Sequence, residues 1–183
     1  MAQQQNGYTI VPHATYDEFR QYALTHGVNV DFSWGNQCYD ICALLWYQYG
    51  LRLQTGNGYA YGCWTLMRNQ NAVLPFIQVA DLNKVKRGDV VVFNHAGSFV
   101  TGHIAFADED YNGSGRLRCL GQNQGQGSSS GTPSNVVNLY TNTFLGAFRN
   151  TSWNNVPPTP PTPTIKRENF PWVLYSRKLR QTR

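Results

Sequence analysis

The spacing of apolar residues changes about halfway along the chain, and this change limits the folds open to it. Up to residue 50 the apolar residues recur at helical spacing, which predicts helices over 14–26 and 38–49. From residue 86 onward, short apolar runs alternate with turn residues, as in β-sheet proteins. The strands expected there are 90–93, 102–107, 116–123, 136–140 and 145–149. Helices followed by closely spaced strands predict an α+β fold, with N-terminal helices packed on an antiparallel β-sheet.

Local signals support the boundaries of both helices. Thr15, with Glu18 three residues later, has the pattern of a capping box, and Gly50 is a suitable stop for the second helix. Residues 51–83 have no clear period, and only a short helix around 63–68 is expected there.

Composition divides the 183 residues into three segments. Residues 1–150 form the expected catalytic domain, 151–164 a Pro/Thr-rich linker, and 165–183 a short basic-aromatic tail. Six of the fifteen Lys and Arg residues, but one of the ten acidic residues, lie after residue 150. The body is therefore near neutral, which argues against nucleic acid as a partner, whereas the tail suits an anionic polymer or another protein.

The ends of the chain show no targeting pattern. No apolar run is long enough to span a membrane, and the first residues have neither the basic nor the apolar part of a signal peptide. We therefore expect synthesis in a cytosol without export by a signal peptide.

One of the four cysteines has a position suited to catalysis. Cys38 begins the second predicted helix, where the helix dipole and free N–H groups favour a thiolate and can hold an oxyanion. His103, on an otherwise apolar strand, is a candidate base for it. Asn123 and Gln122, at the end of the next strand, are within reach to orient the imidazole. No CxxC pair exists, so a structural zinc site is not expected.

Three motifs, in this order, resemble those of the CHAP family of peptidoglycan amidases and endopeptidases. They are Gln37-Cys38-Tyr39-Asp40, Arg87-Gly88-Asp89-Val90-Val91-Val92-Phe93 and Gly102-His103-Ile104-Ala105. The resemblance covers about residues 14–150 and implies a papain-like fold. It also implies that Cys38 attacks an amide carbonyl of bacterial peptidoglycan while His103 acts as general base. We expect Gln37, Gln122 and Trp34 to serve the oxyanion or the substrate.

The chain departs from the family pattern on the third strand. Many phage members read Leu-Glu-Gln-Asn there, with the Glu orienting the histidine, whereas this chain has Gly121 at the position of the Glu. Asn123 matches the Asn, so Asn123 is the predicted third catalytic residue. The missing carboxylate keeps an alternative open, which is a non-catalytic structural or adaptor protein of the virion with a degenerate hydrolase fold.

The resemblance also raises the question of calcium. Some phage members carry a calcium loop just before the cysteine, and Asn29, Asp31 and Asp40 could supply oxygen ligands here. The alternative for Asp40 is an acidic residue in the first helical turn, favourable to the dipole. No cofactor is expected to be required, and calcium is an optional one.

The family leaves three questions open. The reaction is either that of an N-acetylmuramoyl-L-alanine amidase or that of an endopeptidase. The protein is either a free endolysin released through a holin or a virion-associated lysin. In both cases it would be made in the host cytoplasm and act on the cell wall, and in the second case residues 165–183 would bind a phage tail protein.

Overall fold

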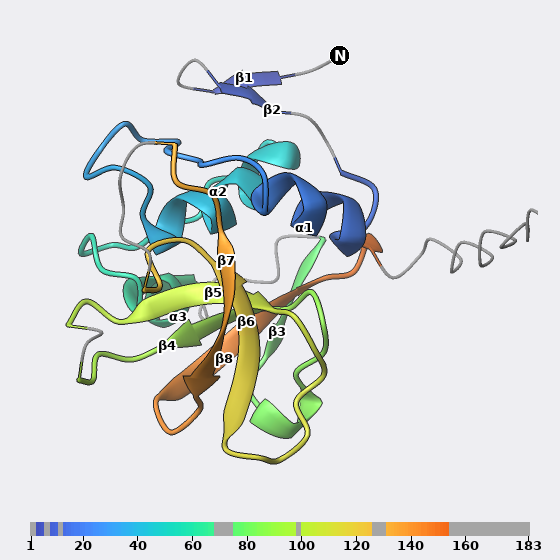
Figure 1. The fold of residues 1–183 in the computed structure, drawn as a ribbon, viewed down its shortest axis with the longest axis vertical. Coiled ribbons are helices and arrows are strands. Elements are labelled where there is room, and N and C mark those ends of the chain that lie inside the picture. The colour runs from blue at the N-terminus through green and yellow to red at the C-terminus, as the bar shows by residue number, and fades with distance from the viewer. Residues whose placement is uncertain are drawn as a thin grey trace, which may run out of the picture.

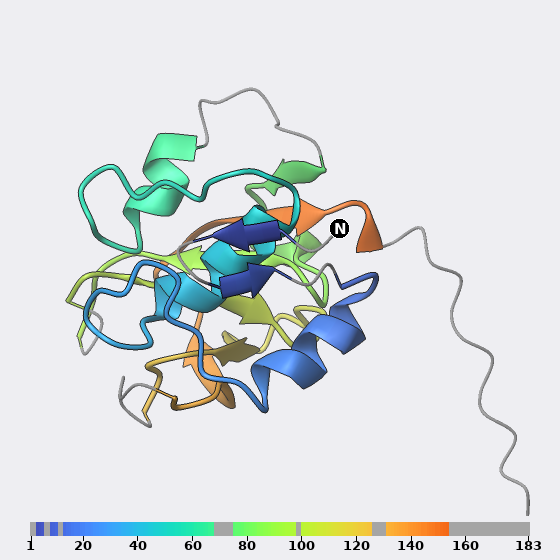
Figure 2. The ribbon, with the colours of Figure 1, turned by 90° about the horizontal axis from the view of Figure 1, so that it is seen from above.

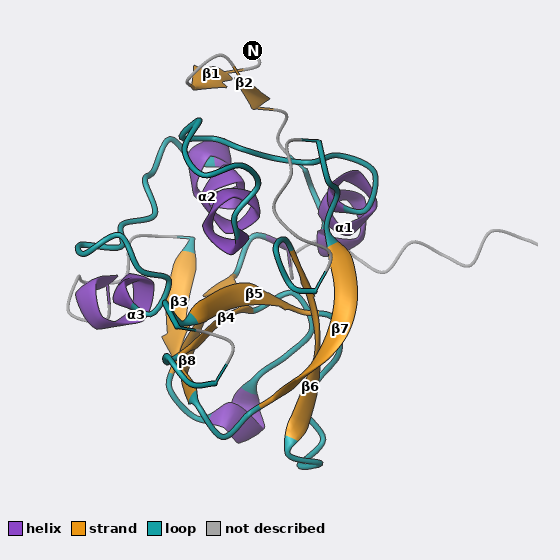
Figure 3. Ribbon diagram, turned by 60° about the vertical axis from the view of Figure 1, so that its left-hand side comes forward, coloured by secondary structure: helices purple, strands orange, loops and turns teal. Residues whose placement is uncertain are grey.

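The computed structural model describes residues 13–67, 75–97, 100–125 and 131–153, together with the backbone of β1 (Gln3–Gln5) and β2 (Tyr8–Ile10). Three helices are present in these parts of the chain: α1 (Tyr16–Ala23), α2 (Cys38–Gln48) and α3 (Gly62–Met67). Helices α1 and α2 lie against one side of a twisted sheet (Figures 1 and 3). The predicted α+β fold and the short third helix are confirmed.

The sheet has the strand order β3-β8-β4-β5-β6-β7, and all its neighbouring strands are antiparallel. Strands β4 to β7 follow one another as a meander, and β8 returns to lie between β3 and β4. The strands are β3 (Phe76–Val79), β4 (Val90–Phe93), β5 (His103–Ala107), β6 (Arg116–Gly121), β7 (Asn135–Tyr140) and β8 (Phe144–Asn150). Viewed from above, α2 crosses the middle of the sheet (Figure 2), and it packs on β5.

In the six-stranded sheet, β3 was not predicted and β6 ends early, and outside that sheet β1 and β2 were also not predicted. Strand β3 was not expected, because it is short and is neither an alternating segment nor, like the equally short β4, a continuous apolar run. Strand β6 ends at Gly121, two residues before the predicted end at residue 123. The chain bends there because Asn123 adopts a left-handed conformation with φ of 50°. This bend takes residues 122–124 out of the sheet and toward the start of α2.

The two central strands are buried on both faces. On the helix side, Val90, Ile104 and Phe106 pack with residues of α1 and α2, including Phe19 and Ile41. On the other side, a second cluster joins Val91, Phe93, Ala105, Leu117 and Ala147. Burial on both faces explains why residues 90–93 form an uninterrupted apolar run rather than an alternating one.

The packed body continues past residue 150. The Trp153 ring lies 5.6 Å from that of Phe19 and 5.7 Å from that of Tyr16, and its indole N–H donates to the His13 carbonyl. The predicted linker is 151–164, and its remaining part, 154–164, lies outside the described residues together with the basic-aromatic tail, 165–183. Among the residues that are described, no helix is long and apolar enough to cross a membrane.

We expect the replacement Trp153→Ala to lower the free energy of unfolding by about 3–5 kcal/mol, because it empties a buried aromatic site. Urea denaturation of the full chain measures this. Trp34→Ala is the matched control, since the Trp34 side chain is 89% exposed. Equal and small effects of the two replacements would show that residues 151–153 are not part of the folded body.

Candidate active site

A buried carboxylate fixes the start of α2, where Cys38 is the first residue. Asp40 is fully buried, and its two oxygens accept the backbone N–H groups of Gln37, at 2.8 Å, and Val30, at 2.9 Å. Burial raises the pKa of Asp40 to about 7, although these N–H bonds oppose the rise. The carboxylate thus joins the loop before the helix to its first turn and holds Cys38 in place.

This role does not fit the predicted calcium set of Asn29, Asp31 and Asp40. Both oxygens of Asp40 accept backbone N–H groups, which fits the alternative that Asp40 is an acidic residue of the first helical turn. Asp31 accepts the Ser33 backbone N–H at 2.8 Å in an exposed turn. Within the described ranges, no group of three or more His, Cys, Asp or Glu residues is arranged to hold a metal ion. The arrangement around Asp40 thus favours a structural role for this carboxylate, and calcium binding stays a prediction.

The Cys38 sulfur faces backbone N–H groups from two elements. The N–H of Ile104 on β5, with those of Tyr39 and Cys38 itself, stabilises negative charge on the sulfur. Burial outweighs this effect and raises the pKa of the thiol to about 11, so the thiol is neutral at neutral pH. The other three cysteines are completely buried in the hydrophobic clusters; they are Cys42, Cys63 and Cys119.

His103 begins β5, opposite Phe93 on β4. The residue before it is Gly102, with φ of 72°, and a Cβ there would lie 2.7 Å from the Phe93 carbonyl oxygen. Only glycine allows the two strands to approach so closely at this point. Burial lowers the pKa of His103 to about 4, so its imidazole is neutral at neutral pH.

Gln124 determines the tautomer of this imidazole. Its amide N–H groups donate to the carbonyls of Cys119, at 3.0 Å, and Asn135, at 2.8 Å, which leaves its Oε1 2.9 Å from Nε2 of His103. Because a carbonyl oxygen only accepts, Nε2 carries the proton. Nδ1 is then the ring atom that can accept a proton from the thiol.

The prediction that Asn123 orients His103 is wrong. The Asn123 amide instead donates to Oε1 of Gln37 at 2.9 Å, because its left-handed backbone turns the side chain toward α2. Gln124, which the sequence analysis missed, holds the ring. The sequence feature that accompanies this role is Gly121. A Cβ at that residue would lie 2.8 Å from Oε1 of Gln124, so the glycine leaves room for the Gln124 side chain. The Gln124 side chain thus fills the space beside Gly121, the position at which the family pattern described above has a Glu.

Gln122 is also not a substrate residue. It is fully buried, and its amide donates to the carbonyls of Val28, at 2.8 Å, and Gln37, at 3.1 Å, and accepts the Val28 N–H at 2.7 Å. It therefore ties the loop before α2 to the end of β6. The other two predicted substrate residues, Gln37 and Trp34, do line a cavity with Cys38.

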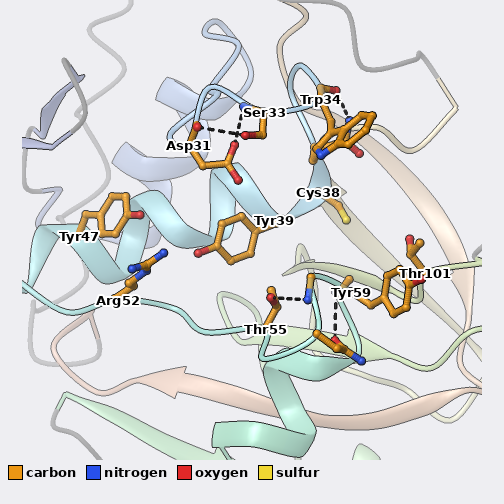
Figure 4. A pocket seen from close by; sticks show the side chains of 14 residues that line it. Asp31, Ser33, Trp34, Cys38, Tyr39, Tyr47, Arg52, Thr55, Tyr59 and Thr101 are labelled. Atoms are coloured by element: carbon orange, nitrogen blue, oxygen red, sulfur yellow. Dashed lines mark hydrogen bonds between the residues drawn. The ribbon is translucent and has the colours of Figure 1, made fainter.

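Cys38 lies where two cavities meet. The larger, of about 760 Å³, extends from Cys38 past Tyr39 to Tyr47 and Arg52 (Figure 4). The second, of about 470 Å³, is lined by Cys38, His103 and Gln124 among others. The fold thus brings the two predicted catalytic residues to one cavity and opens a longer groove on the other side of the sulfur.

The family model of the CHAP domain matches residues 27–123, which include Cys38, His103 and Asn123. The chain belongs to the CHAP domain family. It is 32% identical over 145 residues to a "D-alanyl-L-alanine endopeptidase" of Streptococcus phage B30, a match that covers 78% of this chain and 31% of that protein. This CHAP chain thus spans less than a third of the length of its curated relative.

A solved structure supports the fold. The crystal structure of the wild-type endolysin LysIME-EF1 matches with a TM-score of 0.59 and 22% identity, over 75% of this chain and 64% of that one. The fold implied by the resemblance to the CHAP family is therefore confirmed.

We expect the hydrogen bond from Gln124 to set the pKa of His103, which NMR titration of the imidazole measures directly. Gln124→Ala should lower this pKa below the wild-type value of about 4, because the bond favours the imidazolium. Gln124→Glu should raise it toward the ordinary value of about 6.5, because a carboxylate attracts the charged ring. The base would then be lost through protonation at a higher pH than in the wild type.

Asn123→Ala is the matched control for these variants and should leave the pKa of His103 unchanged, because its amide contacts Gln37. A larger shift in Asn123→Ala than in Gln124→Ala would restore Asn123 as the orienting residue.

Proposed function

We propose that this CHAP domain hydrolyses an amide bond of bacterial peptidoglycan, with Cys38 as nucleophile and His103 as general base. The observation that carries the proposal is the contact between Gln124 and Nε2 of His103, in a cavity that Cys38 also lines. This contact leaves Nδ1 as the proton acceptor. It also supports catalysis over the adaptor alternative, because the missing Glu at position 121 has a substitute.

The reaction begins from a neutral thiol and a neutral imidazole. As Sγ of Cys38 attacks the carbonyl carbon, Nδ1 of His103 takes the thiol proton, and the carbonyl oxygen becomes an oxyanion. The backbone N–H of Cys38 and the side-chain amide of Gln37, a residue that lines both cavities, are the candidates to stabilise it. When the C–N bond breaks, the imidazolium gives its proton to the leaving amine, and a thioester remains. Water, deprotonated by His103, then releases the acid and restores the thiol.

The name of the streptococcal phage relative favours an endopeptidase over an amidase. An endopeptidase would release a new peptide amino group, whereas an amidase would separate the peptide from the muramic acid. We further propose that residues 165–183 bind a partner, which in a virion-associated lysin would be a phage tail protein. The basic and aromatic composition of that segment supports this.

We also propose that the chemistry needs no metal ion. The support is Asp40, whose carboxylate oxygens are both used by backbone N–H groups. Wall hydrolysis should therefore proceed at an unchanged rate in excess EDTA. A loss of activity in EDTA that added calcium restores would instead support a calcium site that includes Asp31.

We expect Cys38→Ala to abolish the clearing of Gram-positive cell walls, measured as loss of turbidity, without lowering the melting temperature. Cys42→Ala lies one turn along the same helix and is the control, because it removes a buried thiol outside the cavities. Mass spectrometry of the soluble products then distinguishes the endopeptidase from the amidase. Clearing by Cys38→Ala at the wild-type rate would contradict the mechanism.

A further inference from the structure

The larger groove beside Cys38 is long enough for several residues of a peptide. Its floor is α2, since Cys38 in the first turn and Tyr47 in the last turn both line it. Nine helical residues at about 1.5 Å each separate their Cα atoms by roughly 13 Å. An extended peptide covers that length with about four residues. A substrate whose scissile bond lies at Cys38 would therefore place residues on one side of that bond along this groove.

Arg52 lies at the end of this groove that is remote from Cys38. The chain reverses after α2 at Gly50, which has φ of 68° and thus a left-handed conformation. Arg52 then runs back along the groove, and its guanidinium lies beside Tyr47 and points toward Tyr39 (Figure 4). The side chains of Arg52 and Tyr39 also line a smaller neighbouring cavity.

The guanidinium of Arg52 is not neutralised by the groove. Among the arginines that the structure describes, Arg52 has neither an ion pair nor a hydrogen bond through its side chain. The others are engaged with acidic groups or a phenol; they are Arg20, Arg87, Arg116, Arg118 and Arg149. Arg52 is exposed, so an anion bound in the groove could pair with its guanidinium without displacing a protein partner.

The neighbours of Arg52 leave its charge available. Burial raises the pKa of both Tyr39 and Tyr47, and Arg52 opposes the rise, so the two phenols stay neutral beside it. The Tyr39 hydroxyl donates to the Leu53 carbonyl at 2.6 Å. Asp31, on the opposite wall, makes no ion pair with Arg52 within 4 Å and instead accepts the Ser33 N–H.

We propose that Arg52 is a specificity residue that binds a free carboxylate of the substrate peptide in the groove between Cys38 and Tyr47. The guanidinium fork matches a carboxylate in two parallel hydrogen bonds, and a carboxamide offers it only one neutral acceptor. The domain would then prefer wall peptides whose acidic group is free over those in which it is amidated. This inference rests on the proposed peptidoglycan hydrolysis and names the chemical form of the substrate.

The test uses the Cys38→Ala chain, which cannot turn over substrate, and calorimetric titration with synthetic stem peptides of the sequence L-Ala-D-isoglutamyl-L-Lys-D-Ala-L-Ala. One matched pair carries the isoglutamyl carboxyl free or as the amide, and a second pair carries the C-terminal carboxyl free or as the amide. We expect one pair to show at least tenfold tighter binding of the acid. The pair that shows it identifies which carboxylate Arg52 binds.

The preference should vanish in Cys38→Ala/Arg52→Gln and be partly kept in Cys38→Ala/Arg52→Lys, which retains the charge without the fork. Asp31→Asn in the same background is the matched control, and it should retain or increase the preference, because it removes the acidic group across the groove. The melting temperature of each variant verifies that it folds. In chains with Cys38 intact, Arg52→Gln should lower kcat/KM for the acid peptide by at least tenfold more than kcat/KM for the amide peptide.

Three results would overturn the inference: no binding of either acid peptide, an acid preference that survives Arg52→Gln, or an equal loss in Arg52→Gln and Asp31→Asn. The last would mean that the two residues form an ion pair that shapes the groove. Failure of the proposed function is a separate result. In that case the wild-type chain would not clear walls or cleave either peptide, whereas the binding measurements would still decide the role of Arg52.

Discussion

The site depends first on the buried carboxylate of Asp40. A hydrogen bond that a backbone N–H donates to a charged group is worth about 1.5–3 kcal/mol, and an unpaired buried group costs a comparable amount. With Asp40 in place, the N–H groups of Gln37 and Val30 are paired inside the protein. The loop then enters α2 at one fixed residue, so Cys38 occupies the first turn, where backbone N–H groups face its sulfur. Without this acceptor the nucleophile would have no defined position.

Three consecutive amides complete the arrangement: two contact Gln37 at the start of α2, and the third contacts His103. Gln122 is bonded to the backbone of Val28 and Gln37, Asn123 to the side chain of Gln37, and Gln124 to the imidazole of His103. This is possible because the strand ends at Gly121 and the left-handed Asn123 reverses the direction of the chain. In a regular strand, residues 122 and 124 would have pointed to one face of the sheet and 123 to the other.

This geometry explains which parts could be predicted from the sequence. The helices and strands β4 to β8 have periodic or continuous apolar patterns and were predicted with small errors at their ends. Strand β3 has neither pattern and was not predicted. Cys38 and His103 were predicted because motifs carry them. Gln124 was missed because its role depends on the φ of the preceding residue and on the space beside Gly121 that its side chain fills, which are tertiary facts. Arg52 was missed for the same reason, since only the reversal at Gly50 brings it to the groove.

A neutral amide in place of a carboxylate has an electrostatic consequence for the resting enzyme. A buried negative charge beside His103 would favour the imidazolium, and the thiolate of Cys38 would then be its partner in an ion pair. Gln124 adds no charge, and burial therefore keeps both groups neutral, with a pKa of about 4 for His103 and about 11 for Cys38. In the proposed mechanism, charge develops only as the sulfur attacks, when the backbone N–H groups around it and the dipole of Gln124 are already oriented. The formal charges that line the larger cavity are those of Asp31 and Arg52. His103 lines the other one, so in the proposed mechanism the groups that select the substrate are separate from the base.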